Sequence, residues 1–305
     1  LTGNKDYLQY SIDWADYNQW KGATSNNKAE WRSTYGESPE YVLFGDWQVC
    51  FQTYADLYKL DPDTIKIARA REVMEYQMST SKLDYWHWVD ALYMVMPVMV
   101  KMYDITKNPL YLEKLHQYLT VTDSIMYDRE VGIYYRDAKY PYPFHKTING
   151  KKDFWSRGDG WAFAAFAKVL KQLPAEDKYR EEYITRFQTM AKSIAACQQP
   201  EGYWTRSLID PEQAPGPETS GTALFTYGFL WGINNGLLNA DIYSPIVEKA
   251  WNYLKTTALQ ADGKIGYIQP VGEKAIPGQV VDANSCFNFG IGAFLLAACE
   301  RVRFL

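Results

Sequence analysis

Apolar residues recur at every third or fourth position along most of the chain, whereas the apolar-polar alternation of a half-buried strand is hard to find. This spacing is typical of amphipathic helices, which bury one stripe of side chains. The pattern therefore predicts an all-α protein. We expect helices at about 4–19, 46–59, 63–78, 88–104, 109–126, 158–173, 178–197, 218–236, 242–258 and 284–302.

The expected helices are joined by two kinds of connection, which alternate along the chain. Short turns follow the first helix of each pair, whereas long loops rich in Gly and aromatic residues lead to the next pair. The chain is therefore a repeat of helical hairpins with a period of roughly 60 residues. The short turns read YKLDPDTI, YDITKNPLYL, LKQLPAEDKY and GLLNADIY.

The first helices of the pairs begin alike, with a polar or acidic group beside a small or aromatic residue and then an apolar run. Hairpins that repeat in this way bury their faces against one another, and about five or six of them can close into a ring. We therefore expect an (α/α)6 toroid, with the long loops and the first-helix N-termini gathered at one end. The positive helix dipoles at that end favour an anionic ligand. The aligned beginnings are FGDWQVCF, HWVDALYM, SRGDGWAF, PETSGTAL and DANSCFNF.

The start of the chain resembles the turn inside one of these hairpins. LTGNKDYLQY is similar to YDITKNPLYLEKL, so we expect the inner helix of a first hairpin to be missing before it. No linker or shift in composition separates a second domain. We therefore expect residues 1–305 to form one domain.

The composition narrows the choice of partners. Of the 305 residues, 47% are hydrophobic and the formal net charge is −4, without a basic patch. These values predict a large core and argue against nucleic acid or an anionic membrane as a partner. No apolar run reaches the roughly 18 residues of a membrane span. The 11 Trp and 25 Tyr point to a cleft that binds sugars, because amphipathic rings suit such ligands.

Histidine and cysteine give no sign of metal or nucleophile chemistry. The chain has three histidines, and none stands in an HxH or HExxH spacing. We therefore expect no metal. We interpret the widely separated Cys50, Cys197, Cys286 and Cys299 as buried thiols.

Two aspartates are the first candidates for chemistry. Asp90 stands among aromatic residues in YWHWVDALYM, where it either stabilises a helix N-terminus or acts as a cleft acid whose pKa the aromatic surroundings adjust. Asp137, in GIYYRDAKY on a long loop, is either a turn residue or a second acid.

The segment WSRGDGW gives Arg157, Asp159 and Trp161 at another helix start. Asp159 is a plain N-cap in one interpretation. In the other, the flanking glycines allow close approach of backbone or ligand.

Two later segments add further candidates. In GYWTRS, Trp204 and Arg206 have the chemistry to stack on a sugar and bind a carboxylate, although Arg206 is equally compatible with a surface residue. Glu218 is either a site residue or an ordinary acid in the first turn of a helix.

Six motifs in order resemble the unsaturated rhamnogalacturonyl hydrolases of glycoside hydrolase family 105 and, more distantly, the unsaturated glucuronyl hydrolases of family 88. The resemblance runs from about residue 46 to residue 303. Two helix openings depart from it, since GDWQ at Asp46 replaces an ADDQ-like sequence and RGDGW at Asp159 replaces RGNGW. We expect both positions to face the pocket and to change subsite preferences. The motifs are HWVDALYMVMP, GIYYRDAKY, FWSRGDGWAFAAFAKVL, GYWTRSLIDP, PETSGTALFTYGFLWGINNGLL and FNFGIGAFLLA.

This resemblance implies a hydrolase that removes the terminal 4,5-unsaturated uronic acid from oligosaccharides released by lyases from polysaccharides of the pectin or rhamnogalacturonan type. A protonated Asp donates to C4 of the vinyl ether, water adds at C5, the hemiketal opens and the aglycone leaves. The resemblance assigns the general acid/base to Asp137 and the second acid to Asp90, without a cofactor. The resemblance assigns a pocket pair to Trp204 and Arg206. The full set of residues that we expect to bind substrate is Asp46, Trp47, His87, Trp155, Arg157, Asp159, Trp161, Trp204, Arg206 and Glu218.

Two other functions are compatible with the same residues. An inverting glycosidase would place two carboxylates roughly 6.5–9.5 Å apart around a saturated glycosidic bond. A carbohydrate-binding protein without turnover would keep the aromatic residues alone. By analogy with the family, we expect a periplasmic or cytoplasmic location in a bacterium.

Overall fold

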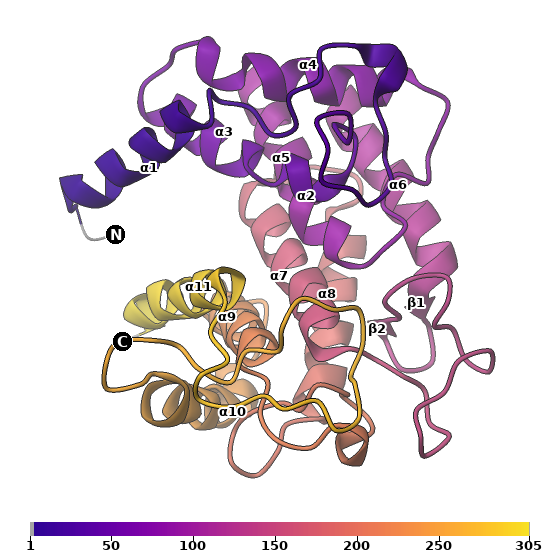
Figure 1. Cartoon of the computed structure of the whole chain (residues 1–305), viewed down its shortest axis with the longest axis vertical. Coiled ribbons are helices and arrows are strands. Elements are labelled where there is room, and N and C mark those ends of the chain that lie inside the picture. The colour runs from indigo at the N-terminus through magenta and orange to yellow at the C-terminus, as the bar shows by residue number, and fades with distance from the viewer. Residues whose placement is uncertain (1–2, 305) are drawn as a thin grey trace. The chain divides into compact units, whose positions relative to one another are not determined.

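The computed structural model describes residues 3–304, which form helices and loops apart from a two-stranded hairpin of β1 (Tyr127–Asp128) and β2 (Ile133–Tyr134) (Figure 1). The chain divides into two compact units. The first unit runs to His87 and includes Ala91–Asp123, whereas the second contains Trp88–Asp90 and the chain from Ser124 onward.

The first unit is built from helical hairpins. Helix α1 begins at Asn4, whose side chain accepts a hydrogen bond from the Asp6 backbone N–H at 2.8 Å. Helix α3 contacts both α1 and α4. The helices are α1 (Lys5–Tyr17), the 3-10 helix η1 (Lys28–Glu30), α2 (Gly45–Gln48), α3 (Phe51–Leu60), α4 (Ile65–Ser79), α5 (Asp90–Thr106) and α6 (Leu110–Met126).

A buried glutamine side chain replaces a backbone hydrogen bond that is missing in α5, the helix that begins at Asp90. Pro97 lies inside this helix and has no N–H, so the carbonyl of Tyr93 loses its usual helical donor. The side-chain amide of Gln52 in α3 donates to that carbonyl at 2.7 Å. This bond fixes α3 against α5 and lets the helix continue to Thr106.

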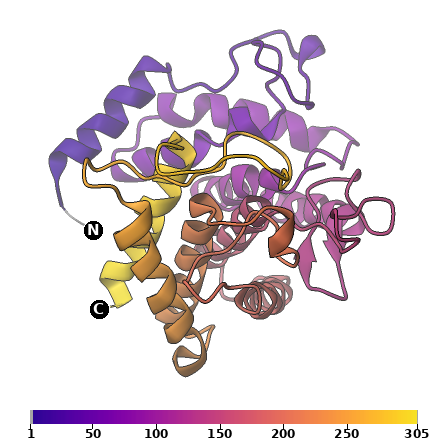
Figure 2. The ribbon, with the colours of Figure 1, turned by 60° about the horizontal axis from the view of Figure 1, so that its bottom comes forward.

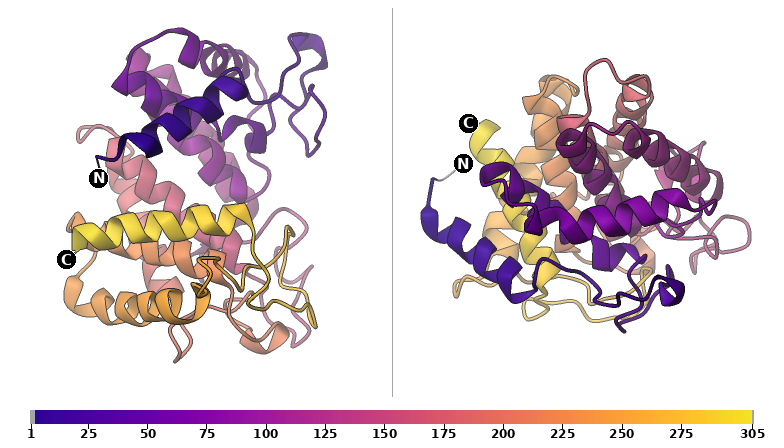
Figure 3. Two further views of the ribbon diagram at one scale, coloured as in Figure 1. Left: turned by 60° about the vertical axis from the view of Figure 1, so that its left-hand side comes forward. Right: turned by 90° about the horizontal axis from the view of Figure 1, so that it is seen from above.

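In the second unit, α9 is the central helix. It contacts α7, α10 and α11, and α7 also contacts α8. Figure 3 shows α11 in yellow beside the orange helices α9 and α10. The helices are α7 (Ser156–Gln172), α8 (Arg180–Ala195), the 3-10 helix η2 (Pro211–Gln213), α9 (Thr219–Asn234), α10 (Ala240–Tyr253), the π-helical turn η3 (Leu254–Ala258) and α11 (Asn288–Phe304).

Two glycines let α7 and α9 lie close together near their N-termini. A Cβ atom on Gly221 of α9 would lie 2.3 Å from the Ser156 hydroxyl oxygen of α7. A Cβ atom on Gly160 would lie 3.0 Å from the Cβ of Leu224. Gly160 of RGDGW and Gly221 of TSGT therefore allow close contact between α7 and α9.

The predicted helices are all present, with two local differences. The predicted helix 46–59 is interrupted, because α2 ends at Gln48 and α3 begins at Phe51. The predicted helix 242–258 begins at Ala240 and ends in the π-helical turn η3. The hairpin of β1 and β2 was not predicted, since two residues per strand are too few to show alternation.

The loops before the helices of the second unit are hydrogen-bonded to one another, as the repeat predicts. Ser156 N–H at the start of α7 donates to Arg206 O at 2.9 Å. At the start of α9, Thr219 N–H donates to Tyr267 O at 2.9 Å. Tyr267 belongs to the long loop between η3 and α11, visible in orange to yellow in Figure 2. These bonds gather the helix starts of this unit in one place.

Candidate active site

The two candidate catalytic residues, Asp90 and Asp137, are brought close together at the start of α5. Trp88 forms an antiparallel bridge with Asp137, and Val89 N–H donates to Arg136 O at 2.8 Å. This pairing places the loop that carries Asp137 beside the turn that leads into Asp90. The side chains are near enough for the charge of Asp137 to raise the pKa of Asp90.

The surroundings of Asp90 raise its pKa. Loss of hydration is the main cause that raises the pKa of Asp90, and the charge of Asp137 adds to it. Arg136 and Arg157 oppose the shift without cancelling it. Its Oδ1 atom has no hydrogen-bond partner among residues 3–304.

Two cationic side chains, Arg136 and Lys139, lie next to the carboxyl of Asp137. Its side chain is almost fully buried, and its Oδ1 accepts a hydrogen bond from the Lys139 backbone N–H at 2.8 Å. The guanidinium of Arg136 donates to Oδ2, and Lys139 Nζ lies 3.6 Å from the same atom. The cluster therefore combines a carboxyl whose pKa is raised, mainly by burial, with a carboxyl bound by two cations, an arrangement suited to acid-base chemistry.

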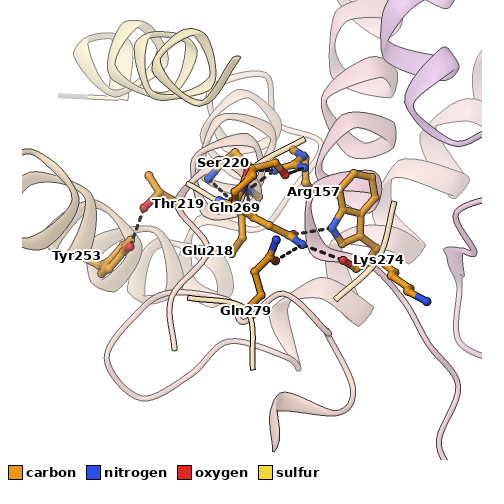
Figure 4. A network of polar contacts seen from close by, with 11 residues as sticks. Arg157, Glu218, Thr219, Ser220, Tyr253, Gln269, Lys274 and Gln279 are labelled. Atoms are coloured by element: carbon orange, nitrogen blue, oxygen red, sulfur yellow. Dashed lines mark hydrogen bonds and ion pairs between the residues drawn. The ribbon is translucent and has the colours of Figure 1, made fainter. Parts of the chain in front are cut away.

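Arg157 is hydrogen-bonded to the loop between η3 and α11. Its guanidinium donates to Gln269 O at 2.6 Å and to Pro270 O at 2.8 Å, and it lies between the rings of Trp155 and Phe289. The indole N–H of Trp155 donates to the side chain of Gln269 at 2.9 Å (Figure 4). The expectation that Arg157 binds substrate finds no support in this geometry, because its donors are directed at backbone carbonyls.

Arg206 holds a later part of the same loop. It donates to Gln279 O at 2.6 Å and to Pro215 O at 2.7 Å, and its side chain is buried. The amide of Gln269 donates to the side chain of Gln279 at 3.0 Å and to Lys274 O at 2.8 Å. Like Arg157, Arg206 uses its guanidinium N–H groups to hold a loop in place, so they are not directed at a ligand.

Glu218 is the N-cap of α9. Its Oε2 accepts from Gly221 N–H at 2.6 Å, and its Oε1 accepts from the backbone and hydroxyl of Ser220. Oε1 also accepts from Gln269 N–H at 3.1 Å, and Arg157 lies 3.9 Å away. This completely buried carboxylate therefore joins the start of α9 to the loop, in agreement with the structural interpretation of a helix-terminal acid (Figure 4).

Trp204 lies in the core and does not offer a face to a sugar. It has no exposed surface, and its indole N–H donates to Ile194 O at 2.7 Å. Its ring packs against Phe225 and Phe229 of α9. The prediction that this residue stacks on a substrate is therefore wrong for this conformation.

We expect Trp204→Phe to lower the free energy of unfolding by about 1 kcal/mol, because one buried hydrogen bond is lost. The Michaelis constant should stay the same, since the side chain touches no ligand surface. Chemical denaturation and steady-state kinetics measure the two quantities. A raised Michaelis constant with unchanged stability would restore the stacking interpretation.

Asp159 and Trp161 are also buried. Asp159 has no exposed surface, and its Oδ1 accepts a hydrogen bond from Tyr134 N–H of β2 at 2.8 Å. Its Oδ2 has no partner in the described part of the chain, and burial raises the pKa of Asp159 well above its usual value. Trp161 is 7% exposed. The expectation that Asp159 faces the pocket is wrong, and it lies in the first turn of α7 instead of at the cap.

The remaining predicted residues belong to the first unit. Asp46 is exposed in the first turn of α2, and the adjacent Trp47 donates from its indole N–H to Gly36 O at 2.9 Å. His87 is half-buried. The cluster around Asp90 and Asp137 is formed by residues of the second unit.

Sequence reasoning missed the residues that surround Asp137 from the last loop. Glu273 lies 3.4 Å from Arg136 and 3.2 Å from Lys139, and the buried Gln269 organises the loop that carries it. The one available signal was a polar residue in the otherwise apolar stretch GYIQPVG.

Among residues 3–304, no group of three His, Cys, Asp or Glu side chains is arranged to hold a metal ion. No helix in that range is long and apolar enough to cross a membrane.

Burial raises the pKa of Cys50 and of Cys197 to about 12. Cys50, Cys197 and Cys286 are only half-buried and Cys299 is exposed, so the interpretation of all four cysteines as buried thiols is wrong.

Comparison with known proteins identifies the family. The sequence profile of glycosyl hydrolase family 88 matches residues 1–305. The chain belongs to this family. An unsaturated 3S-rhamnoglycuronyl hydrolase of Formosa agariphila is 37% identical over 229 residues, which are 74% of this chain and 60% of that protein. A hydrolase of the same name from an Alteromonas species is 36% identical over 71% of this chain and 51% of its own length. The family 88 chain thus spans only about half to three fifths of these relatives.

Solved structures agree with the fold class. A structure described as a polysaccharide lyase is 72% identical, with a TM-score of 0.97 over 100% of this chain and 86% of that chain. A possible family 105 member from Salmonella enterica is 19% identical, with a TM-score of 0.78 over 99% of this chain and 78% of that chain. The predicted (α/α)6 fold class and the resemblance to families 105 and 88 are therefore confirmed.

Proposed function

We propose that this chain is the catalytic domain of a hydrolase that removes the terminal 4,5-unsaturated uronic acid from lyase-generated oligosaccharides. Membership of family 88 and the names of the two relatives support this reaction. The observation that carries the proposal is the acid cluster, in which the loop of the cation-bound Asp137 pairs with the turn before Asp90, whose pKa is raised. The relatives' names also support rhamnose as the sugar after the uronate.

In the proposed reaction the two carboxyls share one transferable proton. Asp137 gives this proton to C4, and the positive charge that develops at C5 is stabilised by the second carboxyl of the pair. Water adds to C5 and returns its proton to Asp137. The hemiketal at C5 then opens, and the hemiacetal left at C1 releases the aglycone as an alcohol. Protons balance over the cycle, because the proton taken by C4 is replaced from water.

A polysaccharide lyase is the second candidate, because the 72% identical structure is described as one. A lyase would remove a proton from C5 of a saturated uronate and eliminate the group at C4. It would thus create the C4=C5 double bond that the hydrolase consumes. The two reactions change the ultraviolet absorbance of this conjugated bond in opposite directions.

One assay separates these functions and the alternatives above. The purified protein is incubated with an unsaturated uronate-rhamnose disaccharide, with its saturated counterpart and with the intact polymer. We expect absorbance to fall with the unsaturated disaccharide alone. A rise with the polymer would identify a lyase, cleavage of the saturated disaccharide a conventional glycosidase, and binding without turnover a carbohydrate-binding protein.

A further inference from the structure

A second carboxylate shares the cations that hold Asp137. Arg136 donates to Asp137 Oδ2 and also lies 3.4 Å from Glu273 Oε2. Lys139 Nζ lies 3.6 Å from the same Asp137 oxygen and 3.2 Å from Glu273 Oε2. Two cations are thus divided between two carboxylates, with Asp90 as a third acid near Arg136.

Glu273 lies beside Arg136 and Lys139 because hydrogen bonds hold its loop in position. The loop between η3 and α11 is tied down by Arg157 at Gln269 and Pro270, and Gln269 closes the loop internally by donating to Lys274 O. Glu273 lies inside the segment that this last bond closes, and its side chain is 44% exposed. A mobile surface glutamate would not hold a fixed share of two cations, whereas this one is carried by a buried framework.

Glu273 is negatively charged under working conditions. Burial opposes ionisation, but hydrogen bonds from Lys139 and Tyr140 and the charges of Lys139 and Arg136 outweigh it and lower the pKa of Glu273. Its negative charge therefore competes directly with that of Asp137 for Arg136 and Lys139. The groups that face the pair are Arg136, Lys139, Tyr140, Glu273 and, on the Asp90 side, Arg157.

We propose that Glu273 is a positioning residue of the acid pair, which draws Arg136 and Lys139 partly away from Asp137 so that the pair retains the proton required at C4. The proposal rests on the proposed function. Without Glu273, both cations would act on the acid pair alone and would favour loss of its proton. Apart from Arg157, whose charge is matched by Glu218 at 3.9 Å, the three acids and two cations of the cluster carry one excess negative charge, which a bound proton neutralises.

The charge-neutral variant Glu273→Gln tests this directly, since it keeps the shape of the side chain. We expect the alkaline limb of the kcat profile to move to lower pH by about half a unit, a modest shift because Glu273 and Lys139 are partly exposed. Lys139→Met should move the same limb to higher pH, because it removes a cation from Asp137. The matched control is Glu130→Gln, which removes an exposed glutamate paired with Lys152 and should leave the profile unchanged.

A titration of the unliganded protein keeps this test separate from the proposed function. Carboxyl carbon NMR of protein labelled at aspartate follows the acid pair without any substrate. Opposite shifts of its midpoint in Glu273→Gln and Lys139→Met support the proposal even if the substrate has been misassigned. Unchanged midpoints in both variants would overturn it, as would a loss of activity in Glu273→Gln with an unmoved pH profile. Failure of wild type to consume the unsaturated disaccharide would refute the proposed function alone.

Discussion

Asp137→Asn is expected to lower kcat on an unsaturated disaccharide by about three orders of magnitude, the usual worth of a positioned general acid. Asparagine keeps the oxygen that accepts from Lys139 N–H, so the loop should remain in place. It has no proton of suitable acidity to give to C4. The rate of absorbance loss measures the effect, and the melting temperature checks the fold.

The matched control is Asp262→Asn. Asp262 is an exposed aspartate paired with Lys264 at 2.7 Å, so this variant undergoes the same chemical change at a distance from the acid pair. Its kcat should equal that of the wild type. Retention of more than about a tenth of the wild-type rate by Asp137→Asn would remove this residue from the role of proton donor.

Asp90→Asn distinguishes the two roles within the pair. If Asp90 tunes and stabilises, its variant should retain a slow reaction with a displaced pH profile, because the charge beside Asp137 has changed. If Asp90 is itself the donor, its variant should be the more damaged of the two. The raised pKa of Asp90 makes this comparison necessary, since the resemblance alone assigns donation to Asp137.

The sequence predicted the elements that depend on local pattern. Helix positions follow from a spacing of apolar residues, and the gathering of helix starts follows from the alternation of short and long connections. Asp90 and Asp137 became candidates because an acid in an aromatic stretch is unusual at any position, and their catalytic roles stay predictions that rest on the resemblance. These features are visible within a few residues of each other.

The orientation of the large polar side chains was not predictable, because their partners are distant in sequence. Arg157 binds a carbonyl 112 residues away, and Arg206 binds one 73 residues away. Nothing near either arginine reveals whether its donors meet a ligand or the backbone. The same limit applies to Trp204, whose core position depends on packing against α9.

These buried groups still bear on the proposed chemistry. Arg157, Gln269 and Glu218 together hold the loop between η3 and α11 against the starts of α7 and α9. That loop carries Glu273 to Arg136. The residues expected to bind substrate thus contribute by fixing the surroundings of the acid pair, which is how a fold pre-organises a site.

Asp159→Asn should make the protein more stable at neutral pH, at about 1.4 kcal/mol for each unit by which burial raises the pKa of Asp159. Asparagine keeps the oxygen that accepts from Tyr134 N–H. The other side-chain polar atom, Oδ2 in Asp159, lacks a hydrogen-bond partner within residues 3–304. The amide nitrogen that replaces it would lack one as well, so the cost of burying an unpaired polar atom is the same in both proteins. What remains is the cost of retaining a proton on a buried acid, which the amide does not bear.

The pH dependence gives this prediction its sign. Burial raises the folded-state pKa of Asp159 well above the usual value of 3.8 that applies in the unfolded chain. Between these two values the folded state binds a proton that the unfolded state releases, so the free energy of unfolding of the wild type falls as pH rises. The advantage of Asp159→Asn should therefore be absent near pH 3 and grow toward neutral pH.

Asp210→Asn is the matched control of opposite sign. Asp210 is equally buried, but hydrogen bonds from Thr147, Asn149 and Lys151 outweigh the effect of burial and lower its pKa. Its replacement should destabilise the protein at neutral pH, and the loss should shrink in acid. Chemical denaturation at several pH values measures both variants. An Asp159→Asn variant whose stability follows the wild type at every pH would show that Asp159 is ionised in the fold, and its unpartnered Oδ2 would then need a cation to balance it.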